Sequence, residues 1–117
     1  MRILIVEIHP PMRRLIRTVV QDLAEAVIEC ADDAEAAALY TAQQFDGGDR
    51  VLMDLEIPGD GGLEGLRRLK RACPDARIII VMQYDDAYLR AAAIEAGACG
   101  CVLKENLLVL RDLISRH

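Results

Sequence analysis

The sequence predicts an α/β protein in which five parallel strands form one doubly wound sheet with five helices. Two observations support this class: five short apolar runs recur along the chain, and each is followed by a segment with helical periodicity. Regular alternation of strands and helices is typical of parallel sheets with right-handed crossovers and helices on both faces. The 117 residues suit one domain, and 53% of them are hydrophobic, which is enough for one core.

Each predicted element follows from a local pattern. The first strand, 2–6, is an apolar run, and the helix after it, 9–26, has apolar residues at a helical period and prolines at its start. The second strand, 27–31, precedes an alanine-rich helix that an aspartate caps and that ends near residue 44. Glycines place a loop before the third strand. The remaining predicted elements are strands 50–54, 77–82 and 99–103, and helices 63–72, 86–96 and 106–116.

Charge and composition argue against several classes of protein. The net charge of −5 is unfavourable for a nucleic-acid surface, and no apolar run approaches the ~20 residues that span a bilayer. The N-terminal run is too short and wrongly flanked for a signal peptide, so we expect a cytoplasmic protein with reduced thiols.

Cys99 and Cys101 suggest a metal site, but Cys30 and Cys73 are not placed to complete it. We therefore interpret the four cysteines as fillers of small buried spaces.

The third predicted strand ends on a charge, and this feature points to function. Three apolar residues, 51–53, precede Asp54, and a strand buried on both faces can place a carboxylate only where it emerges from the sheet. In parallel sheets the functional crevice lies at the carboxyl ends of the strands. The charged residues expected there are Glu7, Asp54, Glu56 and Lys104. Grouped acids are costly unless a cation shares the site, so we predict that Lys104 pairs with Asp54, with one of the glutamates nearby.

Four segments extend this interpretation to a family: RILIVE-HP, VLMDLEIPG, GGLEGLRRL and EAGACGCVLKE. Together, and in this order, they resemble the response-regulator receiver domains of two-component signalling. The resemblance covers the whole chain and implies a single receiver domain over 1–117. It also implies a flavodoxin-like sheet with strand order 2-1-3-4-5. By the same resemblance, Asp54 takes the phosphoacceptor position and Lys104 contacts the phosphoryl oxygens.

Three positions depart from the pattern of that family. Ile8 stands where a second acid would bind Mg²⁺ directly, and an isoleucine offers no oxygen ligand. The remaining candidate ligands are Glu7, Asp54 and Glu56. Met82 replaces a serine or threonine and cannot donate a hydrogen bond to a phosphoryl oxygen, and Cys101 replaces the aromatic residue of the switch. We therefore expect weak Mg²⁺ binding and no resident cofactor.

These departures favour an atypical receiver, because phosphoryl transfer depends on positioning and on neutralising charge. Such a domain is not an enzyme and acts through protein–protein contacts, with weak or no switching by phosphorylation. The alternative is a working phosphoacceptor receiver that a histidine kinase modifies on Asp54. A third class, a small nucleotide- or flavin-binding protein, is disfavoured because the segment after the first strand has no glycine to admit a phosphate.

The last predicted helix carries more apolar residues than one packed face requires. A helix that rests on a sheet needs an apolar stripe only ~100° wide, and Leu108 lies outside the stripe that contains Leu107. By the resemblance, family members commonly dimerise or dock partners through the fourth helix, fifth strand and fifth helix. We expect a homodimer, an output domain or another protein there, without direct contact to nucleic acid or membrane. The residues assigned to this interface are Arg90, Cys101, Leu107, Leu108 and Arg111.

Overall fold

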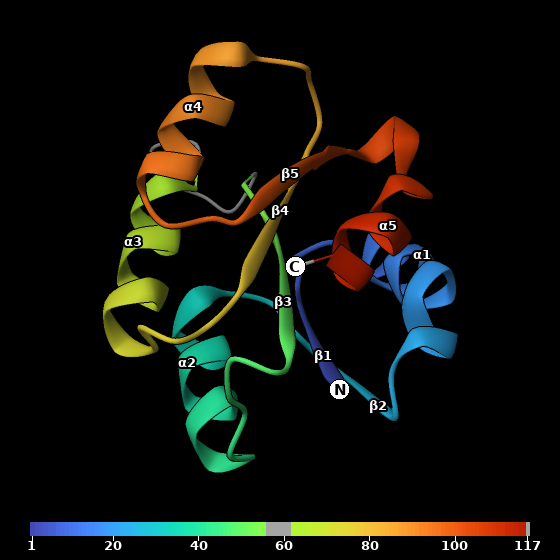
Figure 1. Ribbon diagram of the computed structural model, residues 1–117, viewed down its shortest axis with the longest axis vertical. Helices are drawn as coiled ribbons and strands as arrows, with labels where there is room; N and C mark the ends of the chain where they lie inside the picture. Colours follow the sequence, from blue (N-terminus) through green and yellow to red (C-terminus); the bar gives the residue numbers. More distant parts are fainter. Residues whose placement is uncertain (56–61, 117) are drawn as a thin grey trace.

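The computed structural model describes residues 1–55 and 62–116 and has the predicted alternation of strands and helices. The strands are β1 (Arg2–Val6), β2 (Ala26–Cys30), β3 (Arg50–Asp54), β4 (Ile78–Met82) and β5 (Gly100–Leu103). The helices are α1 (Pro10–Val20), α2 (Asp33–Ala42), α3 (Leu63–Ala72), α4 (Ala87–Glu95) and α5 (Val109–Arg116), with short 3₁₀ turns η1 (Gln21–Leu23) and η2 (Lys104–Asn106). All strand pairs are parallel, in the order β2-β1-β3-β4-β5 (Figure 1). The doubly wound class and its strand order are therefore confirmed.

The sheet separates two apolar layers, which explains why its strands read as unbroken apolar runs. Alternate residues of β1 point to opposite faces. Ile3 and Ile5 pack in the layer beneath α1 and α5, whereas Leu4 and Val6 pack in the layer beneath α2, α3 and α4. With both faces covered, a polar side chain on an inner strand can reach other polar groups only at the ends of the strand.

Two predicted helix boundaries are wrong, and tertiary contacts explain both. The first helix was expected to reach residue 26, but α1 ends at Val20 and Ala26 already pairs with Arg2 at the start of β2. The helical period in the sequence continues to residue 26, but Ala26 pairs with β1 and is the first residue of β2. The final α-helix begins at Val109 instead of residue 106, because the chain leaves β5 through the 3₁₀ turn that starts at Lys104.

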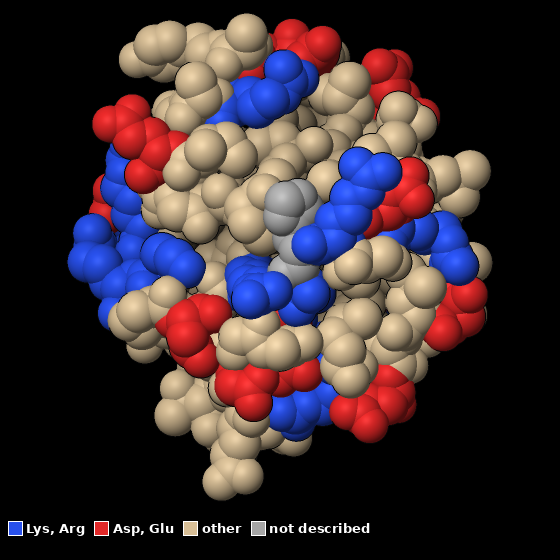
Figure 2. Space-filling view, in the orientation of Figure 1, with Lys and Arg blue, Asp and Glu red and all other residues tan. Residues whose placement is uncertain are grey.

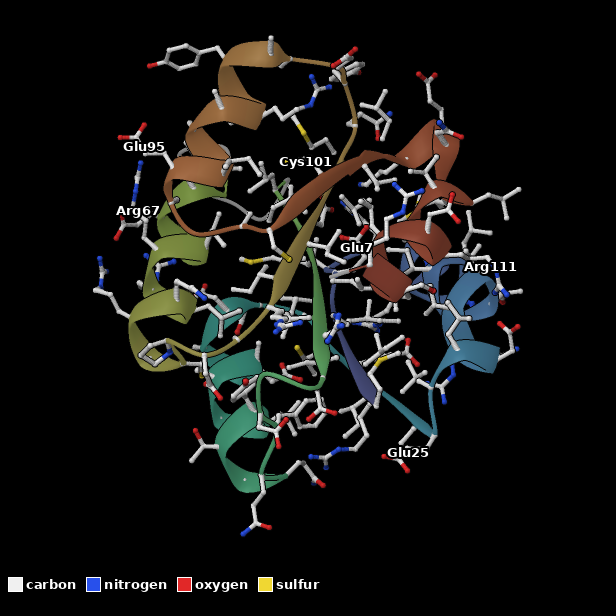
Figure 3. All side chains as sticks on the ribbon, viewed as in Figure 1. Glu7, Glu25, Arg67, Glu95, Cys101 and Arg111 are labelled. Carbon is white, nitrogen blue, oxygen red and sulfur yellow. The ribbon has the colours of Figure 1, made fainter. Side chains whose placement is uncertain are left out.

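Charged side chains tie two pairs of helices together. The Arg111 guanidinium of α5 contacts both carboxylate oxygens of Asp22 at 2.7 and 3.0 Å and donates to the Val19 carbonyl at 2.9 Å, which fixes α5 against α1 (Figure 3). Arg68 of α3 makes a similar two-point contact with the largely buried Asp33 of α2, at 2.9 and 3.1 Å. These forked contacts hold neighbouring helices in a fixed register.

The connection into α3 depends on a glycine. Gly62 has a φ of 81°, and a Cβ atom there would lie 2.3 Å from the Leu55 carbonyl oxygen. Only glycine permits this close approach without strain. The start of α3 therefore packs directly against the carboxyl end of β3, where Asp54 lies.

Within the described ranges, no helix is long and apolar enough to cross a membrane.

Candidate functional site

The carboxyl ends of three strands bring one lysine and two carboxyl groups into contact. Glu7 follows β1, Asp54 ends β3 and Lys104 follows β5. The Lys104 ammonium nitrogen lies 3.1 Å from Asp54 Oδ2 and 3.5 Å from Glu7 Oε1. The predicted ion pair is therefore confirmed, and Glu7 is the glutamate beside it. Glu56, the other candidate, lies outside the described residues.

This cluster is buried, which sets its electrostatics. The side chains of Glu7 and Asp54 are fully buried, and that of Lys104 is only 7% exposed. Burial, followed by the neighbouring Asp54 carboxylate, raises the pKa of Glu7 to about 8, against the opposing charge of Lys104. Desolvation and a like charge both disfavour the ionised acid. At neutral pH Glu7 is consequently mostly protonated, and the ammonium group chiefly balances Asp54.

The backbone of Glu7 is fixed from two sides. Its N–H donates to the Cys30 carbonyl of β2 at 3.0 Å, and its own carbonyl accepts from the Arg13 guanidinium of α1 at 3.0 Å. Arg13 also pairs with Glu29 of β2. Sequence reasoning missed Arg13, because its partner is a backbone carbonyl and leaves no pattern in the sequence. These hydrogen bonds hold the turn after β1 in place.

The three departures from the family pattern lie within, or just after, strands β1, β4 and β5. Ile8 follows Glu7 and is 39% exposed, Met82 ends β4 and is buried, and Cys101 is half-buried on β5 (Figure 3). Burial raises the pKa of the Cys101 thiol, so it remains protonated. At these three positions the site has neither an oxygen ligand, nor a hydroxyl donor, nor an aromatic ring. The carboxyls left for Mg²⁺ among the described residues, Glu7 and Asp54, already contact Lys104.

The residues assigned to an interface have different environments. Leu108 is 71% exposed, whereas Leu107 is buried in the layer beneath α1 and α5 and belongs to the core instead. The Arg111 guanidinium is hydrogen-bonded to Asp22 of η1, so its side chain is held on the side of α5 that faces α1. Arg90 pairs with Asp85 just before α4, and Cys101 is partly covered. Leu108 is therefore the apolar residue of the set that is available to a partner.

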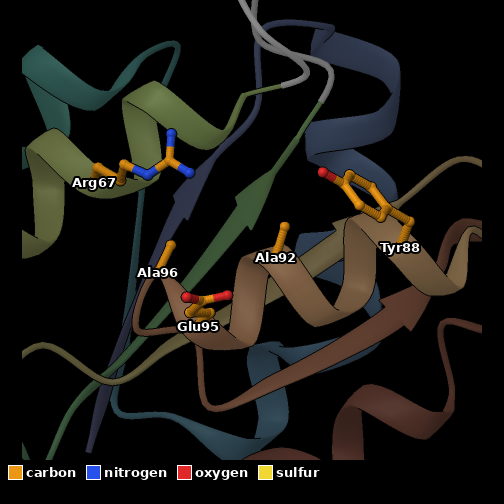
Figure 4. A pocket seen from close by; sticks show the side chains of 5 residues that line it. All are labelled: Arg67, Tyr88, Ala92, Glu95 and Ala96. Atoms are coloured by element: carbon orange, nitrogen blue, oxygen red, sulfur yellow. The ribbon is translucent and has the colours of Figure 1, made fainter.

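A groove that the sequence did not predict lies between α3 and α4 (Figure 4). Its volume is about 320 Å³, and its lining residues are Arg67, Tyr88, Ala92, Glu95 and Ala96. Small alanines on one face of α4 leave this space open. Its lining combines two opposite charges with an exposed tyrosine, so it differs in character from the apolar surface at Leu108.

Comparison with known proteins identifies the family. The chain matches the response regulator receiver domain over residues 3–115. It belongs to this family. Receiver domains are parts of signalling proteins, and the match extends over both the Asp54 cluster and the surrounding fold.

Curated relatives of this receiver include two bacterial regulators. The glycerol metabolism activator of Pseudomonas putida is 36% identical over 107 residues, which cover 90% of this chain and 48% of that protein. The nitrate/nitrite response regulator protein NarP of Escherichia coli is 37% identical over 107 residues, with the same coverage. The chain therefore spans about half the length of these relatives.

Solved structures agree with the receiver fold. A two-component response regulator of the LuxR family from Aurantimonas sp. is 30% identical, with a TM-score of 0.79 over 99% of this chain and 86% of that one. A Vibrio cholerae chemotaxis protein has a TM-score of 0.82 over 98% of this chain and 96% of that one, at 21% identity. The second likeness supports the fold alone.

The raised pKa of Glu7 predicts how stability depends on pH. We expect the free energy of unfolding, measured with urea and without divalent ions, to fall as pH rises from about 4.5 to about 8. In this window folded Glu7 keeps a proton that the unfolded chain has released, so the unfolded state binds fewer protons and rising pH favours unfolding. Glu7→Gln should flatten this slope, and Glu95→Gln, at an exposed glutamate, should not. Equal slopes in the wild type and Glu7→Gln would contradict this assignment.

The isoleucine at position 8 leads us to expect that the domain binds Mg²⁺ weakly. A calorimetric or NMR titration of the wild type should show little specific response below millimolar concentrations, because Mg²⁺ requires near-octahedral oxygen coordination and Ile8 offers no oxygen. Ile8→Asp should strengthen binding, whereas the control Ile8→Leu should not. Tight binding by the wild type, with no gain in Ile8→Asp, would show that another group replaces the missing ligand.

Proposed function

We propose that residues 1–117 form one atypical receiver domain, which acts by binding a protein and responds weakly or not at all to phosphorylation. The observation that carries this proposal is the closed cluster at the ends of the strands. Lys104 is already shared between Asp54 and Glu7. The neighbouring positions that would bind a metal or relay a switch hold isoleucine, methionine and cysteine.

The electrostatics of phosphorylation support this proposal. A phosphoryl group on Asp54 would bring roughly two negative charges into a site whose described residues supply one ammonium group. Phosphoryl transfer relies on metal ions and hydrogen-bond donors to neutralise such charge. The buried thioether of Met82 cannot donate, and Cys101 has no ring to reorient. A phosphorylated state would therefore be weakly stabilised and poorly transmitted to the surface.

The alternative is a working receiver that a histidine kinase phosphorylates on Asp54. One observation favours it: the acceptor carboxylate and Lys104 lie 3.1 Å apart, as the phosphoacceptor and lysine roles require. The relatives, among them a nitrate/nitrite response regulator, are consistent with either form. In both forms the chain is proposed to be a cytoplasmic signalling module without enzyme activity or resident cofactor.

A phosphodonor distinguishes the two forms. We expect incubation with acetyl phosphate and Mg²⁺ to leave little phosphoryl adduct on the wild type by intact-protein mass spectrometry. Restoring the missing oxygens in the double variant Ile8→Asp/Met82→Thr should increase the adduct, because both side chains stabilise the transferred group. Asp54→Asn is the control for modification elsewhere. A substantial wild-type adduct that Asp54→Asn lacks would support the alternative.

We further propose that a second copy of the chain, an output domain or another protein binds the face around Leu108. This face comprises α4, β5 and the start of α5, and Arg90 and Cys101 border it. Leu108 is 71% exposed and the adjacent Val109 is 37% exposed. Leu108 lies in the turn just before α5, next to Val109, and an exposed apolar surface of this kind supports a site of protein association.

A charge at Leu108 tests this face. Leu108→Glu should weaken self-association in sedimentation experiments and leave the far-ultraviolet circular dichroism unchanged, because the side chain contributes little to the core. Leu15→Glu is the matched control, since Leu15 is an exposed leucine of α1. A wild type that stays monomeric at high concentration would contradict the homodimer.

A further inference from the structure

The carboxyl group of Glu7 lies beside Lys104 without a directional bond of its own. Both carboxyl oxygens are buried, and neither has a hydrogen-bond partner among the described residues. The nearer oxygen, Oε1, lies 3.5 Å from the Lys104 ammonium nitrogen, which is an ion-pair distance. A well-formed hydrogen bond would fix the direction of a side chain as well as its distance. The placement of this carboxyl group therefore depends on the backbone that carries it.

Hydrogen bonds on both sides fix that backbone, and one of them comes from a side chain. The Glu7 N–H donates to the Cys30 carbonyl at 3.0 Å, which extends the pairing of β1 with β2 by one residue. The Glu7 carbonyl accepts from Arg13 Nη1 at 3.0 Å. The start of α1 offers less support, because His9 makes no side-chain cap and the first two helical residues are prolines without an N–H. Arg13 is therefore the side chain that holds the turn after β1.

Glu29 of the edge strand β2 sets the direction of the Arg13 guanidinium. Arg13 Nε lies 3.4 Å from Glu29 Oε1, and the other oxygen of the same carboxylate accepts a hydrogen bond from Arg17. Figure 2 shows Lys and Arg side chains next to Asp and Glu side chains on the side of the molecule where α1 and α5 lie. The two arginines of α1 thus share one acid, but Arg13 also reaches the Glu7 carbonyl.

We propose that Arg13 is a positioning residue, which holds the Glu7 carboxyl group against Lys104 through the Glu7 carbonyl. A guanidinium suits this role because its donors point in fixed directions and its charge strengthens each hydrogen bond. The Arg13 side chain is only 24% exposed, so water competes weakly for the bond. The inference rests on the proposed function in one respect, since it takes the cluster of Glu7, Asp54 and Lys104 as the working site. Loss of Arg13 would let Glu7 move away from Lys104 and change the charge balance around Asp54.

The ¹⁵N resonance of the Lys104 ammonium group tests this role, because that group lies beside Glu7. Glu7→Ala gives the position of the resonance without a neighbouring carboxyl group at residue 7. Arg13→Met should move the resonance toward that position, with the far-ultraviolet circular dichroism unchanged. Arg17→Met is the matched control, since it removes the same charge from the same helix and also loses Glu29, but keeps the bond to the Glu7 carbonyl.

Hydrogen exchange provides a second measurement of the same role. In Arg13→Met the Glu7 amide should exchange about tenfold faster relative to the Val51 amide, because a hydrogen bond from a charged group is lost. The Val51 N–H donates to the Arg77 carbonyl at the other end of the sheet, so it serves as an internal reference for overall stability. Arg13→Lys should restore most of the protection, because an ammonium group can still donate to the Glu7 carbonyl.

Three outcomes would overturn the proposal: an unmoved Lys104 resonance in Arg13→Met, an equal shift in Arg17→Met, or an equal rise in exchange at Glu7 and Val51. If Arg13→Met does not fold, Arg13→Gln decides, because its shorter side chain loses the same contact. A shift toward the Glu7→Ala position would then support the proposal, and no shift would overturn it. None of these measurements uses a phosphodonor, so a phosphoryl adduct on the wild type would overturn the atypical receiver and leave the role of Arg13 intact.

Discussion

The candidate site depends on one buried ammonium group that two buried carboxyls share. Lys104, Glu7 and Asp54 come from the ends of β5, β1 and β3, so their contacts join the edge strand β5 to the inner strands β1 and β3. Removal of one partner of a buried ion pair typically costs ~3–5 kcal/mol, because the other charge is left uncompensated. The need to balance these charges therefore constrains the arrangement of the whole carboxyl edge.

Much of this organisation could be predicted from the sequence. The five strands were recognisable because they are apolar runs that the sheet buries on both faces, and the contact between Lys104 and Asp54 followed from parallel topology. The end of α1 was not predictable, because a continuous helical period hides the point where Ala26 joins the sheet. Local patterns equally cannot reveal that Arg111 pairs with Asp22, which lies 89 residues away in the sequence.

The protonation of Glu7 and the buried Nε–H of Arg50, which has no hydrogen-bond partner among the described residues, share one physical origin. In both cases the fold withdraws an ionisable group from water without a complete set of partners. Such incomplete pairing is uncommon in protein interiors, since each instance is unfavourable for folding. The two groups lie at opposite edges of the sheet, since Arg50 begins β3 and Glu7 follows the end of β1.

The pairing of helices has a mechanical consequence. Arg111 joins α5 to α1 and Arg68 joins α3 to α2, whereas among the described residues no ion pair joins α4 to another helix. Ala93 and Leu89 hold α4 through apolar packing, which has no directional bonds to break when the helix slides. The domain therefore has two helix pairs that ion pairs fix in position, and a helix, α4, that is held mainly by apolar packing. We expect elastic deformation of the molecule to concentrate at α4, whatever the source of the load.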